Sequence, residues 1–203
     1  MTAFAADAKA KDKEYIQRFI PEAAINSLND QFINITCMRT PYSRVTLAMI
    51  YPEDYPLAPL IVQLSSPTLP KPLLKKKEQE CMIKASEFIK EGNEESRGQV
   101  RIVHNAVQDF IQDNVFVPCW RELKQIMTLY ERANSANKIV ADEKTGCINI
   151  KLISRGYFQI VKIQVPDMYP EEGIEVSKCA VLNYITCFGD DSNVVFYLES
   201  HSS

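Results

Sequence analysis

The sequence predicts an α+β protein made of two tandem domains, each an antiparallel meander covered by helices. The first observation behind this prediction is a recurring segment, SRVTLAMIYPEDYP at 43–56 and YFQIVKIQVPDMYP at 157–170. Its members at matching positions are Pro52, Tyr55 and Pro56 in the first copy and Pro166, Tyr169 and Pro170 in the second. The second observation is the chain length of 203 residues, because domains of roughly 100 residues are common. We expect a first domain at 12–116 and a second at 117–203, after a flexible N-terminus at 1–11.

Strand periodicity surrounds the first copy. Apolar Val45, Leu47, Met49 and Tyr51 occupy alternate positions, which places them on one face of a strand. The run Pro59–Leu64 predicts a further strand that ends at Ser65-Ser66-Pro67. An upstream Ile-Asn-Ile strand at 33–35 recurs at 148–150. The order of strand, turn, strand and proline corner therefore occurs twice.

Helical spacing predicts helices on either side of these strands. One covers about 73–89, a second carries Val103, Val107 and Ile111, and a third begins near Pro118. We expect the third helix to open the second domain, as a helix near Tyr15–Ile20 opens the first.

The second copy is less complete than the first. We expect strands at about 147–153, 158–165 and 174–176, with a turn at Ser154-Arg155-Gly156. The sequence after Val176 has strand-like runs but no counterpart of the two helices that follow the first copy. Either the second domain is abbreviated, or the chain is a fragment or variant whose natural end differs.

The proline corner is the most specific motif. Tyr55-Pro56-Leu57-Ala58-Pro59, preceded by Glu53-Asp54, resembles the Tyr-Pro-x-x-Pro element of the RWD family, which is related in fold to ubiquitin-conjugating enzymes. The resemblance is weaker over 118–203, where Gly173 stands in place of the second proline. Proline cannot donate to a sheet ladder, so Pro56 and Pro59 would end the strand while the Tyr55 ring packs beneath. The corner is therefore interpreted as scaffold.

Catalytic motifs are missing. Ubiquitin-conjugating enzymes carry a His-Pro-Asn element between this corner and their cysteine, and no histidine or asparagine lies between Pro59 and Cys81. Cys81 falls on an apolar helical stripe, which favours a buried, inert thiol. His104 is interpreted as a helix-face histidine that makes one hydrogen bond, and His201 as solvated. With no glycine-rich phosphate loop either, the prediction is a chain that is not an enzyme.

The composition of the chain argues against several classes of partner and cofactor. A net charge of −3 provides no broad positive field, which argues against nucleic acid. The six cysteines include no C-x-x-C pair, so we expect reduced thiols, no metal site and no cofactor. No stretch of the sequence has the roughly 18 apolar residues of a membrane span, and the start lacks a signal-peptide core. We expect a cytoplasmic or nuclear protein.

One charged cluster is a candidate partner-binding surface. Its members, at the start of the predicted 73–89 helix, are Lys71, Lys75, Lys76 and Lys77. Cations at a helix N-terminus oppose the helix dipole and so do not stabilise the helix. An ordinary solvated face is the alternative interpretation.

The resemblance to the RWD family implies a protein-interaction adaptor. The association of that family with ubiquitin ligases makes a ubiquitin-pathway complex the first expectation for partners. Tandem RWD domains also occur in kinetochore subunits, so a structural subunit of such an assembly is one alternative. A catalytically dead relative of ubiquitin-conjugating enzymes is the other.

Overall fold

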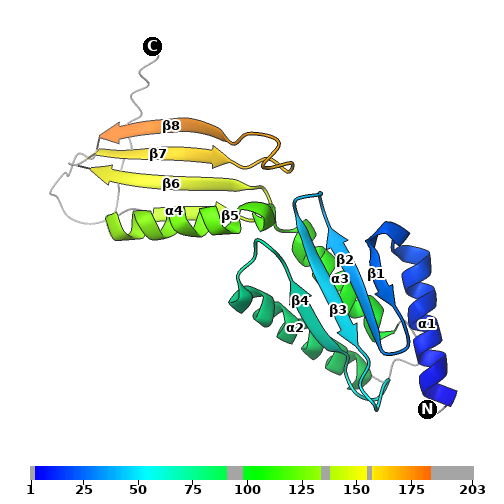
Figure 1. Ribbon diagram of the computed structural model, residues 1–203. Coiled ribbons are helices and arrows are strands. Elements are labelled where there is room, and N and C mark those ends of the chain that lie inside the picture. Colours follow the sequence, from blue (N-terminus) through cyan, green and yellow to red (C-terminus); the bar gives the residue numbers. More distant parts are fainter. Residues whose placement is uncertain (1–2, 91–97, 134–137, 155–156, 184–203) are drawn as a thin grey trace. The chain divides into compact units, whose positions relative to one another are not determined.

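The computed structural model describes residues 3–90, 98–133, 138–154 and 157–183. The chain divides into two compact units, Met1–Trp120 and Arg121–Ser203. Each unit contains a four-stranded sheet in which neighbours in sequence are neighbours in space, with orders β1-β2-β3-β4 and β5-β6-β7-β8 (Figure 1). The predicted α+β class is confirmed.

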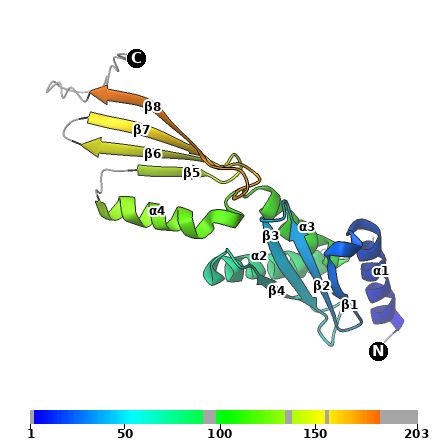
Figure 2. The same cartoon turned by 45° about the horizontal axis from the view of Figure 1, so that its top comes forward.

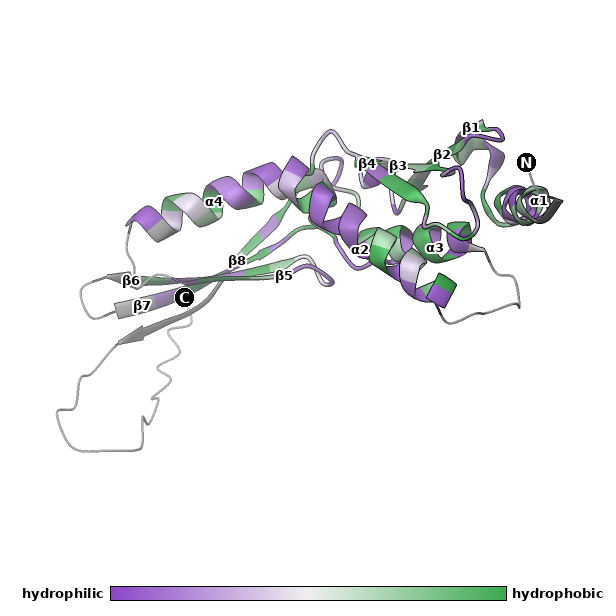
Figure 3. Cartoon of the chain, turned by 90° about the horizontal axis from the view of Figure 1, so that it is seen from below, coloured by the Kyte–Doolittle hydropathy of each residue, from purple (hydrophilic) through white to green (hydrophobic). Residues whose placement is uncertain are grey.

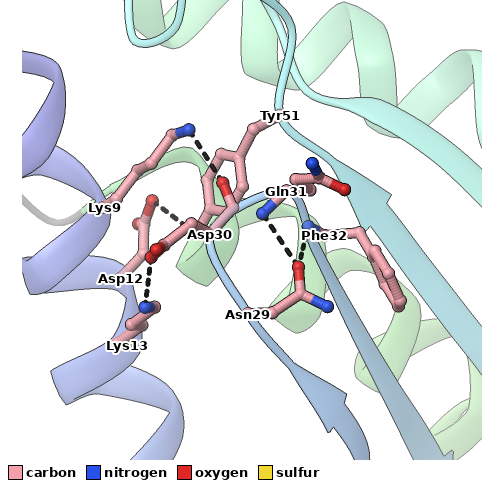
Figure 4. Close-up of polar contacts among 8 residues, drawn as sticks. All are labelled: Lys9, Asp12, Lys13, Asn29, Asp30, Gln31, Phe32 and Tyr51. Carbon is pink, nitrogen blue, oxygen red and sulfur yellow. Dashed lines mark hydrogen bonds and ion pairs between the residues drawn. The ribbon is translucent and has the colours of Figure 1, made fainter. Parts of the chain in front are cut away.

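The first sheet is an antiparallel meander with one apolar face. Its strands are β1 (Ile25–Leu28), β2 (Phe32–Met38), β3 (Arg44–Ile50) and β4 (Ile61–Ser65). Burial alternates along β2, β3 and β4, as the period of two requires. The turn between β1 and β2 is held by Asn29, whose Oδ1 accepts hydrogen bonds from the N–H groups of Gln31 and Phe32 (Figure 4).

Two helices cover the apolar face of this sheet. Helix α2 (Lys71–Lys90) lies against β4, and α3 (Gln99–Gln112) lies against β2 and β3 (Figure 2). The helices bury Leu74, Cys81 and Ala85 from α2 and Val100, Val103, Ala106, Val107 and Ile111 from α3. Short 3₁₀ turns at Glu22–Ala24 (η1) and Val117–Cys119 (η2) complete the unit.

Helix α1 (Ala3–Phe19) is longer than the sequence led us to expect. Residues 3–11 are helical, where we expected a flexible segment with the helix starting near Tyr15. Alanine and lysine are good helix formers, and the segment also contacts the domain. Ala5 is buried, and Lys9 Nζ donates to the carbonyl oxygen of Asp30 at 2.8 Å.

The second sheet repeats the strand order of the first, and among the described residues of its unit one helix, α4, accompanies it. Its strands are β5 (Lys138–Asp142), β6 (Cys147–Ser154), β7 (Tyr157–Gln164) and β8 (Glu175–Asn183). Helix α4 (Trp120–Ala133), which mixes hydrophilic and hydrophobic residues, lies along one face of this sheet (Figures 1 and 3). Of the expected turn at 154–156, Arg155 and Gly156 lie outside the described residues. β8 extends to Asn183, well past the expected end at Val176, because its backbone pairs with β7 along the whole length of that strand.

The two sheets pair in the same register. Ile33 pairs with Met49 and Met49 with Val62 in the first sheet. At the repeat-equivalent positions, Ile148 pairs with Ile163 and Ile163 with Val176. Directly paired residues lie on the same face of a sheet, so the equivalence extends to the faces. Residues of the second sheet can therefore be compared one by one with residues of the first.

Candidate functional site

The Tyr-Pro corner follows β3 and leads the chain into β4. Tyr55 N–H donates to Pro52 O at 3.1 Å, and the N–H groups of Leu57 and Ala58 donate to Asp54 O. The second corner repeats this pattern. Tyr169 N–H donates to Pro166 O, and the N–H groups of Glu171 and Glu172 donate to Met168 O. Both Tyr-Pro peptide bonds are cis.

Tyr55 points into the first unit. Its ring is buried and packs edge-on against the ring of Tyr51, with centroids 4.7 Å apart. The hydroxyl of Tyr55 donates a hydrogen bond to the Asp12 carboxylate, and the hydroxyl of Tyr51 donates to the same group at 3.4 Å. Asp12 comes from α1, so the corner and the first helix are joined through a buried carboxyl group.

Burial dominates the electrostatics of this cluster. It raises the pKa of Asp12 to about 6, although the hydrogen bonds from Tyr55 and Tyr51 act in the opposite direction. Burial and the adjacent Asp12 also raise the pKa values of both tyrosines. Lys9 lies over the Tyr51 ring, 4.8 Å from its centroid, and Lys13 pairs with Asp30 (Figure 4).

Gln99 fastens the corner from the other side. It is buried at the first position of α3, and its Oε1 accepts a hydrogen bond from Leu60 N–H at 2.8 Å. Its Nε2 donates to Pro56 O at 2.9 Å and to Ala58 O at 3.2 Å. These three bonds satisfy backbone groups that the proline turn leaves without sheet partners.

Sequence reasoning singled out the corner but missed both residues that hold it. Each carries the same recognisable signal, a polar residue on an apolar helical stripe. Asp12 lies four residues before the buried Ile16, and Gln99 lies four residues before the buried Val103. A buried polar residue of this kind needs partners, which here are the corner's hydroxyl and backbone groups.

Two buried cysteine side chains, Cys37 and Cys81, favour the protonated thiol. Burial raises the pKa of Cys37 to about 12 and also raises that of Cys81, although Lys77 and Lys84 oppose the shift at Cys81. Cys119 is buried and Cys147 half-buried. The side chains of Cys179 and Cys187 lie outside the described residues. A protonated thiol is a poor nucleophile.

His104 is half-buried on α3 and faces α1. Its Nδ1 lies 3.0 Å from the hydroxyl of Tyr15, which also donates to Asn105 Oδ1 at 3.3 Å. Burial lowers the pKa of His104, which favours the neutral imidazole. His201 lies outside the described residues.

The structure divides the lysine cluster. Lys71, Lys75 and Lys76 are exposed at the start of α2. Lys77 is only 17% exposed, pairs with Glu80 at 3.1 Å and lies 5.3 Å from the Phe110 ring centroid. Lys77 lies between the buried residues Leu74 and Cys81 on the face of α2 that packs on the sheet, which explains why it is less exposed than the other three lysines. Three of the four lysines are therefore presented to solvent.

Within the described ranges, no group of three or more His, Cys, Asp and Glu side chains could hold a metal ion. No helix there combines the length and the apolar character that crossing a membrane requires. Comparison of the chain with protein-family models, curated proteins and solved structures finds no match.

Replacement of Asp12 by asparagine should change how stability depends on pH. The folded pKa of about 6 lies above the ordinary 3.8, so the Asp12 contribution is fully present below the unfolded value and is lost as pH rises through 6. The advantage of Asp12→Asn over the wild type in unfolding free energy should therefore grow by about 2 kcal/mol between pH 4 and pH 7. Urea denaturation at several pH values measures this. The lowered pKa of His104 gives both proteins the same opposite dependence of unfolding free energy on pH, so it cancels in the difference between them. Parallel curves of unfolding free energy against pH for the two proteins would contradict the raised pKa of Asp12.

Replacement of Gln99 by alanine should destabilise the first unit by about 1–3 kcal/mol, because the buried N–H of Leu60 loses its acceptor. Gln112→Ala on the same helix is the matched control. Its side chain is exposed, and its effect should stay within about 0.5 kcal/mol. Equal effects of the two substitutions in urea denaturation would show that Gln99 does not hold the corner.

Proposed function

We propose that this chain is a non-catalytic protein-interaction adaptor built from two RWD-like domains. The observation that carries the proposal is the orientation of the first corner. Its hydroxyl and backbone groups are used inside the domain, by Asp12 and Gln99, to fasten α1 and α3. A motif whose tyrosine hydroxyl and proline-turn carbonyl groups are directed to internal partners supports a scaffold role.

The environment of the thiols supports the non-catalytic part of the proposal. A cysteine that forms a thioester needs an accessible, low-pKa thiol. Cys37 and Cys81 are buried, and their pKa values are raised. Function then resides in surfaces, as it does in adaptors.

The proposed partners are proteins of a ubiquitin-pathway complex, such as a ubiquitin ligase. This choice rests on the resemblance of Tyr55-Pro56-Leu57-Ala58-Pro59 to the RWD corner. The three exposed lysines Lys71, Lys75 and Lys76 are one candidate contact surface of the first unit for an acidic partner.

Incubation of the full chain with ubiquitin, activating enzyme and ATP should give no thioester, because Cys37 and Cys81 are buried thiols with raised pKa values. The readout is a ubiquitin adduct on a non-reducing gel that disappears with reducing agent. An active conjugating enzyme is the positive control. An adduct formed by the wild type and lost in Cys81→Ser would overturn the non-catalytic assignment.

Purification of the tagged full chain from its own cells should recover a stoichiometric ubiquitin ligase or conjugating enzyme, identified by mass spectrometry. A chain truncated after Trp120 is the control, because it keeps Val117 and Cys119, which are buried in the first unit. Loss of the partner on truncation would assign its binding to the second unit. Recovery of centromere proteins instead would favour the kinetochore alternative and contradict the ubiquitin assignment.

A further inference from the structure

Helix α1 and the beginning of α3 line a pocket of about 300 Å³ in the first unit, which we call the α1–α3 pocket. Its aromatic residues are Tyr15 and Phe19, whose ring centroids are 5.2 Å apart. The side chain of Phe19 is 61% exposed, so the pocket is open to solvent where this ring lies. The volume is at the lower end of the range for ligand sites, and it suits one or two side chains of a partner.

Two arginines of the pocket carry charges that the first unit leaves unpaired. Lys11 also lines the pocket, but its charge is paired with that of Asp7 at 2.8 Å. Arg18 and Arg101 form no ion pair with any residue that the structure describes. The lining residues include one carboxylate, Glu14, which is likewise unpaired within the described ranges. Two unpaired guanidinium groups against one carboxylate leave the pocket with an excess of positive charge.

Contacts between the two helices hold the walls of the pocket in position. The hydroxyl of Tyr15 lies 3.0 Å from Nδ1 of His104 on α3. Gly98 lines the pocket just before α3, and it approaches α1 so closely that a Cβ atom at this position would collide with the Asp12 carboxylate. The pocket is therefore formed before a ligand binds, which lowers the entropic cost of binding.

The chemistry of these residues favours a ligand that combines a carboxylate with an apolar group. A guanidinium group can pair with a carboxylate through two parallel hydrogen bonds. The rings of Tyr15 and Phe19 offer apolar contact area to a neighbouring side chain. A nucleic acid fits less well, because its affinity comes from many phosphate contacts and the chain has a net charge of −3.

We propose that the α1–α3 pocket is the docking site for an acidic segment of a partner protein, in which an aspartate or glutamate lies next to an apolar residue. The carboxylate of the segment pairs with Arg18 and Arg101, and its apolar side chain contacts Tyr15 and Phe19. The inference rests on the proposed adaptor function and assigns that function to a surface of the first unit, formed by other residues than the exposed lysines of α2.

Selection from a random peptide library displayed on phage, with the immobilised full chain as bait, identifies the class of ligand. The enriched peptides should share an aspartate or glutamate next to an apolar residue. They should no longer be enriched when the bait is the double variant Arg18→Gln/Arg101→Gln with a wild-type circular dichroism spectrum. Enrichment of peptides without acidic residues, enrichment that the double variant leaves unchanged, or no enrichment at all would overturn the inference.

A matched pair of substitutions on α1 separates the pocket from the overall charge. Arg18→Gln and Gln17→Glu each lower the net charge by one unit at exposed neighbouring positions, but Gln17 does not line the pocket. Fluorescence anisotropy with one enriched peptide should show a Kd about fivefold or more higher for Arg18→Gln, because a charge-assisted contact is lost. The Kd should stay within about twofold of wild type for Gln17→Glu. Equal effects of the two substitutions would contradict docking in the pocket.

The carboxylate of the pocket provides a test of the opposite sign. Glu14→Gln removes the one negative charge of the lining, so the same peptide should bind about twofold or more tightly than it binds the wild type. The variant should keep the wild-type melting temperature, because Glu14 is exposed. Weaker binding to this variant would contradict recognition of an acidic segment.

The two proposals fail in different ways. If the wild type recovers a protein partner from its cells and the double variant Arg18→Gln/Arg101→Gln recovers it equally well, the docking site is wrong while the adaptor function stands. If the wild type recovers no protein partner at all, the adaptor function fails and the docking site fails with it.

Discussion

The structure depends on one constraint, that the apolar face of a β-sheet must be removed from water. Each meander presents such a face, because its side chains alternate and one set is aliphatic. In the first unit α2 and α3 cover this face, and Ile33, Leu47 and Met49 are fully buried. In the second unit the same face carries Ile174 and Val176 at positions open to solvent. A fully buried aliphatic side chain contributes roughly 1.5–3 kcal/mol, so the covered face contributes strongly to the stability of the first unit.

The Tyr-Pro corner solves a related problem for polar groups. Where β3 passes to β4, the prolines interrupt the hydrogen-bond ladder, and the backbone groups there need other partners. Gln99 satisfies three of them, and the hydroxyl of Tyr55 is satisfied by Asp12. The raised pKa of Asp12 shows that this arrangement carries an electrostatic cost at neutral pH. The corner therefore ties the sheet to α1 and α3, and its side chains are committed to structure.

Local patterns in the sequence predicted the repeat, three strands of each meander and helices α2 to α4, but not the first strands, β1 and β5. These features depend on the spacing of apolar residues and on the position of proline, and both are visible within a short window of sequence. The partners Asp12 and Gln99 were missed because they join segments far apart in the chain. Lys77 was grouped with its neighbours because its contact with Phe110 comes from another helix. The extent of β8 was underestimated because backbone pairing with β7, rather than its own alternation, determines where it ends.

Residue-level solvent labelling of the free chain tests the central claim, that two equivalent faces are unequally covered. Carbene footprinting with mass spectrometry reports the accessibility of individual aliphatic side chains. Ile174 and Val176 should be labelled strongly, and their equivalents Leu60 and Val62 should be protected in the same sample. Comparable protection of the two pairs would mean that the second sheet is already closed, and would contradict the account.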